Sequence, residues 1–460
     1  MFHSLWSSLS SLFADPPPTR ATTAGLPPRR RTSTSVAATA TAPASAGDDV
    51  TTGLLTRTEV MDAALNIRGY EFALRGDLRE RIRTQGRPVR DFLDDLLISQ
   101  LETHAGTLLQ ERRAWLQVWE GSLQRGIAER LPPRTCLLLV PDNATRPAPP
   151  ETRARIASLR ASGFEVWLDD CFGTPWFASL ADNANGIVLR MAWRTPNETG
   201  AMLGKLKQDW PGLRRAAWEV ASYEDQALVA KLGCSLFSGG FVTHRGNWAG
   251  NQLSPQVLHV ATLINKVRAD ADNREMAAVL KQDLAMSYRL LRFVNTSTQG
   301  LNHAISSIEQ GLMVLGQSQL DRWLTLLLLT GSAGAGGALT EMALSRARFL
   351  ELLGQGRLNA TDCERLFVLG LFSMLDVALK VPLEDAITPL RLPEDMNLAL
   401  LRHKGPFGAC LALAEACERG EAARVEQLAV SMRLSTARIN ARQLEALAWV
   451  AANSRETAVA

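Results

Sequence analysis

The chain has 460 residues, of which 46% are hydrophobic, and a formal net charge of +3 at pH 7. This length predicts two or three domains with ordinary cores, and the small net charge argues against nucleic acid as the partner. The six Cys are scattered without a CxxC pair, and no apolar run approaches the roughly 20 residues of a membrane span. We therefore expect a reduced, cytoplasmic protein without a zinc site, a disulfide framework, a cofactor or a transmembrane segment.

Residues 1–53 are predicted to be a disordered, low-complexity N-terminus. Ala, Thr, Ser and Pro dominate residues 14–50, a composition that buries too little apolar surface to fold. Residues 2–13 carry large apolar side chains on one helical stripe. Two interpretations stay open for them: a short helix for a membrane surface or a partner, and a frayed terminus, which we favour.

Residues 54–248 alternate short β-type runs with amphipathic stretches. Such alternation predicts a parallel sheet with helices outside it, and a closed (β/α) barrel is our first choice. In such barrels the chemistry lies at the C-terminal ends of the strands. The predicted strands are Leu65–Leu74, Trp115–Trp119, Cys136–Val140, Glu165–Asp169, Ile187–Met191, Ala216–Val220 and Leu236–Val242.

Acidic residues stand at two of these strand ends, Glu71 in GYEFALR and Asp169 with Asp170 in LDDCFGT. Carboxylates that converge at a barrel mouth hold Mg²⁺ or Mn²⁺ in phosphodiester hydrolysis, but polar rims are also common accidents. The first motif resembles the opening motif of EAL domains, the phosphodiesterases of cyclic di-GMP, and the second resembles their LDDFGTG loop. The resemblance implies that Glu71, Asp169 and Asp170 match metal-binding positions, and that Arg75 matches an Arg that faces guanine or phosphate.

The same resemblance implies that the rest of the metal and base set is missing. The family's Asn falls on Gln117, its second metal Glu on Leu139, its Lys on Val188, the Asp two residues later on Arg190, its next Glu on Trp218 and its closing Gln on Ser238. Two-metal hydrolysis needs several anionic oxygens and a base. We therefore expect a catalytically inert barrel without a metal.

Residues 249–460 are predicted to be all-helical. Leu284, Tyr288, Leu291 and Val294 form one apolar stripe, and Asp272–Glu275 and Ser306–Glu309 are capping boxes. The Gly-rich run at 330–337 has no P-loop lysine and does not fit the dinucleotide fingerprint, so we interpret it as a loop between helices.

The run KQDLAMSYRLLRFVNTSTQGLNHAISSIEQGLMVLG at 281–316 resembles the HDOD domain, a degenerate relative of the HD phosphohydrolases. Ser345 lies in the helix where that larger group has a lone His, and Ser373 and Met374 stand where it has His-Asp. Ser and Met are poor ligands for a hard cation. His303, in the turn before the second capping box, is interpreted as a polar turn residue. The order of barrel and helices is similar to EAL–HDOD signal-transduction proteins.

That resemblance implies a non-enzymatic bacterial regulator that acts through protein partners. Two alternatives stay open: a weak metal-dependent cyclic di-GMP phosphodiesterase that uses Glu71, Asp169 and Asp170, and a cyclic di-GMP receptor without turnover. The sequence does not identify the partner.

Overall fold

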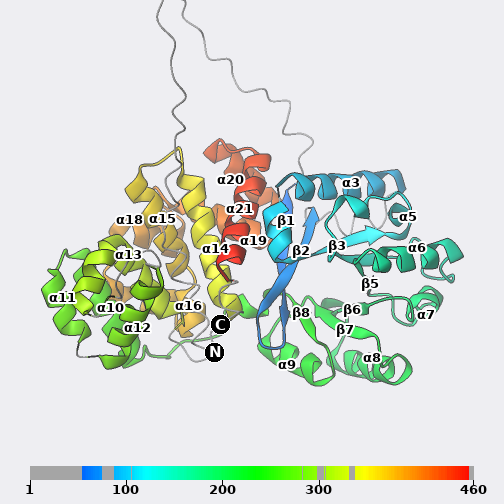
Figure 1. Cartoon of the computed structure of the whole chain (residues 1–460), viewed down its shortest axis with the longest axis horizontal. Coiled ribbons are helices and arrows are strands. Elements are labelled where there is room, and N and C mark those ends of the chain that lie inside the picture. The colour runs from blue at the N-terminus through cyan, green and yellow to red at the C-terminus, as the bar shows by residue number, and fades with distance from the viewer. Residues whose placement is uncertain are drawn as a thin grey trace, which may run out of the picture.

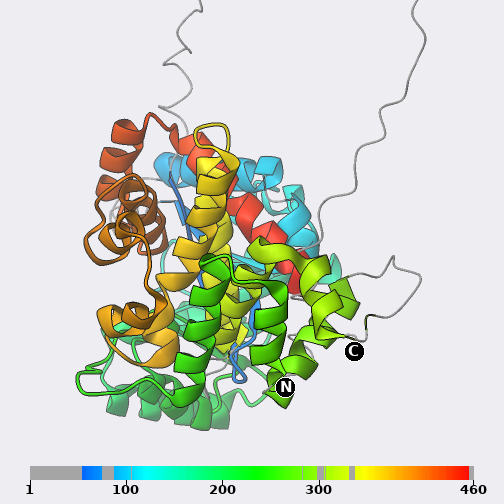
Figure 2. The ribbon, with the colours of Figure 1, turned by 90° about the vertical axis from the view of Figure 1, so that its left-hand side faces the viewer.

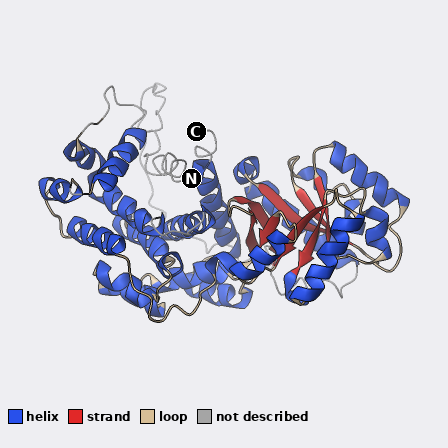
Figure 3. Ribbon diagram, turned by 90° about the horizontal axis from the view of Figure 1, so that it is seen from below, coloured by secondary structure: helices blue, strands red, loops and turns tan. Residues whose placement is uncertain are grey.

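The computed structural model describes residues 54–74, 87–104, 106–281, 283–297, 305, 307–330 and 337–454. An eight-stranded closed barrel is followed by an all-helical half (Figures 1 and 3), which confirms the predicted fold class. The predictions for residues 1–53, Arg75, His303 and 331–336 lie outside the described residues. The strands are β1 (Leu55–Asp62), β2 (Ile67–Leu74), β3 (Arg113–Trp119), β4 (Cys136–Val140), β5 (Glu165–Asp169), β6 (Gly186–Arg190), β7 (Arg214–Trp218) and β8 (Leu236–Ser238).

Strand β1 runs antiparallel to both of its neighbours, β2 and β8, whereas the neighbouring pairs from β2 to β8 are parallel. The expectation of a parallel sheet was therefore wrong for β1. This strand was also missing from the strands predicted from the sequence. The physical reason is visible in its composition. Arg57 and Glu59 form an ion pair, and their side chains are only about one-tenth exposed. These two polar residues therefore interrupt the alternation of apolar and polar residues that indicates a strand.

The inside of the barrel is filled by large aromatic side chains. Trp115, Trp167 and Trp218 lie there, each at most 1% exposed, in a cluster separate from the core outside the strands. Gly69 and Gly186 face these rings: a Cβ on Gly69 would collide with Trp115, and one on Gly186 would collide with Trp167. The barrel is thus a packed core and not a pore, as in other (β/α) barrels.

Helices and short 3-10 turns connect the strands and cover the barrel. They are α3 (Arg87–His104), α4 (Gly106–Glu111), α5 (Glu120–Leu123), η1 (Ala128–Arg130), α6 (Pro150–Ala161), α7 (Pro175–Leu180), η2 (Met191–Trp193), α8 (Pro196–Asp209), α9 (Tyr223–Lys231) and η3 (Gly240–Thr243). Thr195 caps α8 through a capping box with Glu198, and Thr174 and Ser222 cap α7 and α9.

The second half contains only helices among its described residues. They are α10 (Pro255–Arg268), α11 (Asn273–Leu280), α12 (Leu284–Ser297), α13 (Ile308–Thr330), α14 (Gly337–Gly354), α15 (Ala360–Phe372), α16 (Leu375–Leu379), α17 (Leu383–Ile387), η4 (Thr388–Leu390), α18 (Glu394–Arg402), α19 (Gly408–Glu418), α20 (Ala422–Met432) and α21 (Thr436–Ser454). Asp272 caps α11, and α13 is kinked at Gly316, where φ is 70°. The predicted stripe on α12 was wrong at Tyr288, which is 60% exposed, because Leu290 and Phe293 face the core instead.

The two halves share one continuous hydrophobic cluster. Helix α19 lies against β1, α14 lies against β2, and α21 lies against α3 and α4. The helical half stands in front of the barrel when viewed from its own side (Figures 1 and 2). The amide of Leu55 donates to Oδ1 of Asn440 over 3.1 Å, and Nδ2 of Asn440 donates to Oε1 of Gln100 over 3.0 Å. Helix α21 is therefore anchored to the barrel by buried polar contacts as well as apolar ones.

Taken singly, the described helices are either too short or too polar to cross a membrane. Residues 360–379 and 383–390 meet that criterion of length and composition only as a pair, and the pair is bent by 118°.

Candidate functional site at the mouth of the barrel

The candidate site lies where the parallel strands end, which we call the mouth. Side chains alternate between the two faces of each strand. Because Trp115, Trp167 and Val188 point into the barrel, the residue two positions after each of them also points inward. On β3 and β5, Gln117 follows Trp115 and Asp169 follows Trp167, and on β6 Arg190 follows Val188. Glu71 reaches the same place from β2. Side chains from four strands therefore meet in one layer.

Arg190 is the centre of this layer. Its Nε and Nη2 donate to the two carboxylate oxygens of Asp169, each over 2.9 Å, and Nη2 lies 3.5 Å from Oε1 of Glu71. Its Nη1 donates to Oε1 of Glu219 over 3.0 Å. The side chains of Arg190, Asp169 and Glu71 are 1%, 0% and 6% exposed. One guanidinium thus pairs with buried carboxylates from two strands, in a bidentate geometry with Asp169.

Burial by itself disfavours the charged form of Arg190, but Asp169 and then Glu71 outweigh it and raise the pKa of the guanidinium above its ordinary value. The side chain is therefore a permanent cation. Gln117 completes the set, because its Nε2 donates to Oδ2 of Asp169 over 2.6 Å. Both oxygens of Asp169 are consequently occupied by donors from its own chain.

Asp170 does not join Glu71 and Asp169. It follows the last residue of β5 in a left-handed conformation, with φ at 49°, and its amide donates to the carbonyl of Val188 over 2.9 Å. Its Oδ1 accepts from the amide of Arg190 over 3.1 Å and from the Arg194 guanidinium. This carboxylate ties β5 to the loop after β6 instead of facing the shared layer.

Apart from Gln117 and Arg190, the positions that the EAL resemblance marks as degenerate are apolar or small. Val188 and Trp218 belong to the barrel interior and are buried, and Ser238 is buried with its hydroxyl unpaired by any described residue. Leu139 packs in the core outside the strands, whereas its neighbour Leu138 points into the barrel. The interior position on β4 is therefore a leucine as well.

The divalent metal ions that the EAL resemblance implies do not fit this arrangement. The guanidinium of Arg190 lies between Glu71 and Asp169, where a cation would need their oxygens. Among the described residues no three His, Cys, Asp or Glu side chains are grouped so as to hold a metal ion. Hard cations need several oxygen ligands, and here those oxygens already serve an arginine.

A comparable arrangement occupies the helical half. Nη1 of Arg346 on α14 donates to Oγ of Ser373 over 2.8 Å, and its Nε donates to Oε1 of Glu418 over 3.0 Å. Ser345, Ser373 and Met374 are all buried. Arg245, which follows η3 at the end of the barrel, donates to the carbonyl of Ser373 and pairs with Asp376. The two halves therefore meet at the position that the HD resemblance marks as degenerate.

Arg194, Glu219 and Arg346 were not named from the sequence, and Arg190 was named only as the position where the EAL family has an Asp, not as the centre of the site. A signal for Arg190 was present, because alternation from Val188 places it inside the barrel, and a buried arginine needs carboxylate partners. Glu219 had no such signal, since it lies just beyond β7 with φ at 61°. Arg75 lies outside the described residues.

Comparisons with known proteins agree with the assignment of an EAL-like barrel followed by an HDOD domain. A family model described as the HDOD domain matches residues 253–386. The chain is 28% identical over 298 residues to the cyclic di-GMP phosphodiesterase CdgJ of Vibrio cholerae, which covers 64% of this chain and 68% of CdgJ. It is 23% identical over 341 residues to the uncharacterized protein YuxH of Bacillus subtilis, covering 70% of this chain and 81% of YuxH. Among solved structures, the PaMucR phosphodiesterase in complex with c-di-GMP has a TM-score of 0.33 and 17% identity, over 41% of this chain and 94% of that one. The chain is a relative of the cyclic di-GMP phosphodiesterases in which an EAL-like barrel is followed by an HDOD domain.

Proposed function

We propose that this chain is a regulatory scaffold in bacterial cyclic di-GMP-type signalling, that it does not hydrolyse cyclic di-GMP, and that it acts by binding protein partners. The observation that carries the proposal is the guanidinium of Arg190, which holds both oxygens of Asp169 at 2.9 Å and lies 3.5 Å from Glu71. Similarity to CdgJ supplies the signalling context.

Arg190 weakens the attraction of this mouth for a metal ion. Two unit charges 4 Å apart interact by about 4 kcal/mol at an effective dielectric of 20, so the arginine would offset about 8 kcal/mol of the attraction that the carboxylates offer a divalent ion. The hydrogen bonds of Asp169 would be lost as well. To use the oxygens of Asp169, a divalent ion would have to displace an arginine that is 1% exposed and held by three carboxylates.

The mouth also lacks a group to activate water at the positions that the EAL resemblance marks. Val188 and Trp218, which stand at the Lys and Glu positions, are buried and apolar. A general base must lie within hydrogen-bond reach of the water that it deprotonates. Glu71 and Asp169 are both engaged with Arg190, so neither is positioned as a free base.

What the chain keeps is the arrangement of two domains. The halves are joined by a continuous core, by Asn440 on α21 and by Arg245 at the end of the barrel. Such a body presents fixed surfaces to other proteins, which suits a scaffold. The finer alternatives, a weak phosphodiesterase and a receptor without turnover, are separated from the scaffold by one experiment.

The experiment follows hydrolysis of cyclic di-GMP by chromatography with the purified full chain in Mg²⁺ and in Mn²⁺, and titrates the same samples by calorimetry. We expect no linear dinucleotide. Turnover that requires metal and is lost in Glu71→Gln, but kept in the control Glu224→Gln on the exposed start of α9, would overturn the proposal. Saturable heat without product would make the barrel a receptor.

A further inference from the structure

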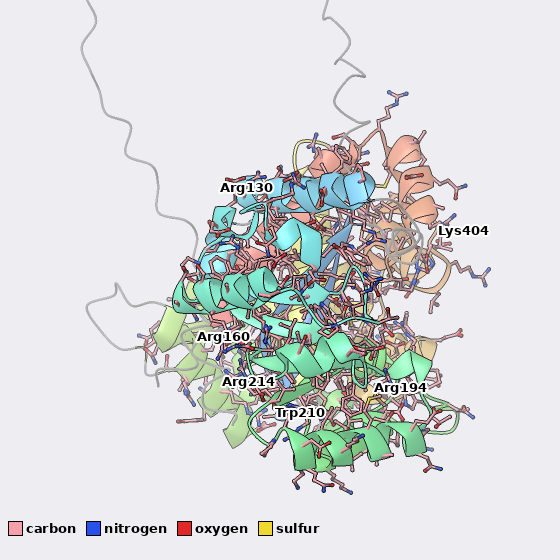
Figure 4. The ribbon with its side chains drawn as sticks, turned by 90° about the vertical axis from the view of Figure 1, so that its right-hand side faces the viewer. Arg130, Arg160, Arg194, Trp210, Arg214 and Lys404 are labelled. Carbon is pink, nitrogen blue, oxygen red and sulfur yellow. The ribbon has the colours of Figure 1, made fainter. Side chains whose placement is uncertain are left out.

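A basic cavity lies at the end of the barrel opposite the mouth, where the parallel strands begin. Its volume is about 420 Å³. Figure 4 shows the two ends: Arg214, which begins β7, lies apart from Arg194, which follows β6 at the mouth. Five arginines from four stretches of the chain line the cavity together with a tryptophan: Arg68, Arg112, Arg113, Arg134, Arg214 and Trp115.

The carboxylates nearby do not neutralise all five arginines. Arg68 pairs with Asp62 at 2.6 Å, and Arg112 pairs with Glu341 at 2.8 Å. Arg113 and Arg214 share one carboxylate, that of Glu165.

Glu111 also lines the cavity. Together with the three partner carboxylates of Asp62, Glu341 and Glu165, this makes four carboxylates for five guanidinium groups. Within the described part of the chain, Arg134 has no carboxylate partner, and its side chain is exposed beside the cavity. The lining therefore has one cation in excess, and its least constrained member is free to turn toward a ligand.

Two buried donors of the lining have no partner among the described residues. Trp115 is 1% exposed, and its Nε1 makes no hydrogen bond. Nε of Arg112 is buried and equally unpaired. A buried N–H without an acceptor costs about 1–3 kcal/mol. Both nitrogens are enclosed by protein, so the donors that a ligand can reach are those of the more exposed arginines: the side chains of Arg68, Arg113 and Arg214 are 58%, 36% and 44% exposed.

We propose that this cavity binds a small phosphorylated metabolite that carries at least two phosphate charges. Guanidinium groups present planar forks of N–H donors that match phosphate oxygens. The volume is in the range of small-molecule sites and exceeds what a single phosphate group fills. The cavity shares no residue with the mouth, so the proposal stands apart from the question of cyclic di-GMP hydrolysis.

The test titrates the full chain with pyrophosphate by calorimetry at low salt without divalent ions, and then with ATP. The cavity variant is Arg68→Gln with Arg134→Asn. Both side chains are exposed, and Asn tolerates the positive φ of 80° at position 134. The matched control is Arg402→Gln with Arg424→Gln, two exposed arginines of the last helices, which removes the same charge.

We expect saturable binding of pyrophosphate to the wild type and to the control, and affinity reduced on the order of ten-fold or more in the cavity variant, because two charge-assisted contacts are lost. If the double variant does not fold, Arg134→Asn alone replaces it, since Arg134 holds no ion pair. Absence of saturable binding, or equal weakening in the control, would overturn the proposal.

Discussion

Replacing Arg190 by Met should destabilise the protein strongly, because it leaves Glu71 and Asp169 buried without their cation. Their side chains are 6% and 0% exposed. Removing one partner of a buried ion pair typically costs 3–5 kcal/mol, a large part of the 5–15 kcal/mol that holds a domain folded. We expect the free energy of unfolding at pH 7, measured by urea titration with circular dichroism, to fall by about 4 kcal/mol.

The two amide substitutions separate charge from packing. Arg190→Met combined with Glu71→Gln and Asp169→Asn should recover a large part of the stability at pH 7, because neutral amides leave no buried charge without its cation. A packing defect would be unaffected by the two amides.

The control is Arg68→Met. Arg68 pairs with Asp62 at 2.6 Å, but its side chain is 58% exposed. Exposed pairs contribute about 0–1 kcal/mol, so this variant should stay within about 1 kcal/mol of the wild type. The reasoning about the mouth is refuted if Arg190→Met loses no more than this control, or if the two amides recover none of the loss.

Three further variants test other buried polar groups by the same urea titration. Burial raises the pKa of the Asp94 carboxyl to about 7, so its stabilising contribution is present below the ordinary pKa near 4 and is lost as the pH rises to 7. Asp94→Asn should therefore be more stable than the wild type at pH 8, by up to about 4 kcal/mol. This gain in stability should vanish near pH 4. Arg346→Met should cost about 3 kcal/mol, because Ser373 and Glu418 lose their buried donor, and a loss below about 1 kcal/mol would contradict that role. Asn440→Ala should cost about 1–3 kcal/mol, because the buried amide of Leu55 is left unpaired, and an unchanged unfolding midpoint would show that α21 does not depend on this contact.

The fold was largely predictable because its signals are local. Alternation of buried strands with capped helices indicated the barrel, and the helical half followed from its apolar stripes. The failures have physical causes. Strand β1 was missed because Arg57 and Glu59 satisfy each other as a pair, which no single-residue pattern reveals. Tyr288 was assigned to the core because two neighbouring faces of α12 both carry apolar residues three to four positions apart. Packing against α13, which the sequence does not show, decides which of the two faces is buried.

The carboxylates of the candidate site could be predicted from the sequence, but the role of Arg190 at its centre could not. Glu71 was expected at a strand end but lies within β2, whereas Asp169 ends β5. Both side chains point into the closed barrel, which brings non-adjacent strands together, so their proximity follows from the fold class. Asp170 stands at the same strand end as Asp169, yet its left-handed backbone turns the carboxylate to other donors. Backbone conformation at one residue decides this difference, and the sequence LDDC does not disclose it.

The two halves share a structural solution in which an arginine holds buried polar groups. A buried carboxylate without a partner is destabilising, so the buried acids at both places need a counter-charge or a donor. Arg190 supplies the counter-charge at Asp169, and Arg346 supplies the donor for Glu418 near Ser373. Arg245 then extends from the barrel to Asp376 and to the carbonyl of Ser373. Because a guanidinium is always charged, these pairings persist over the ordinary range of pH, and Arg245 links the barrel to the helical half beside one of them.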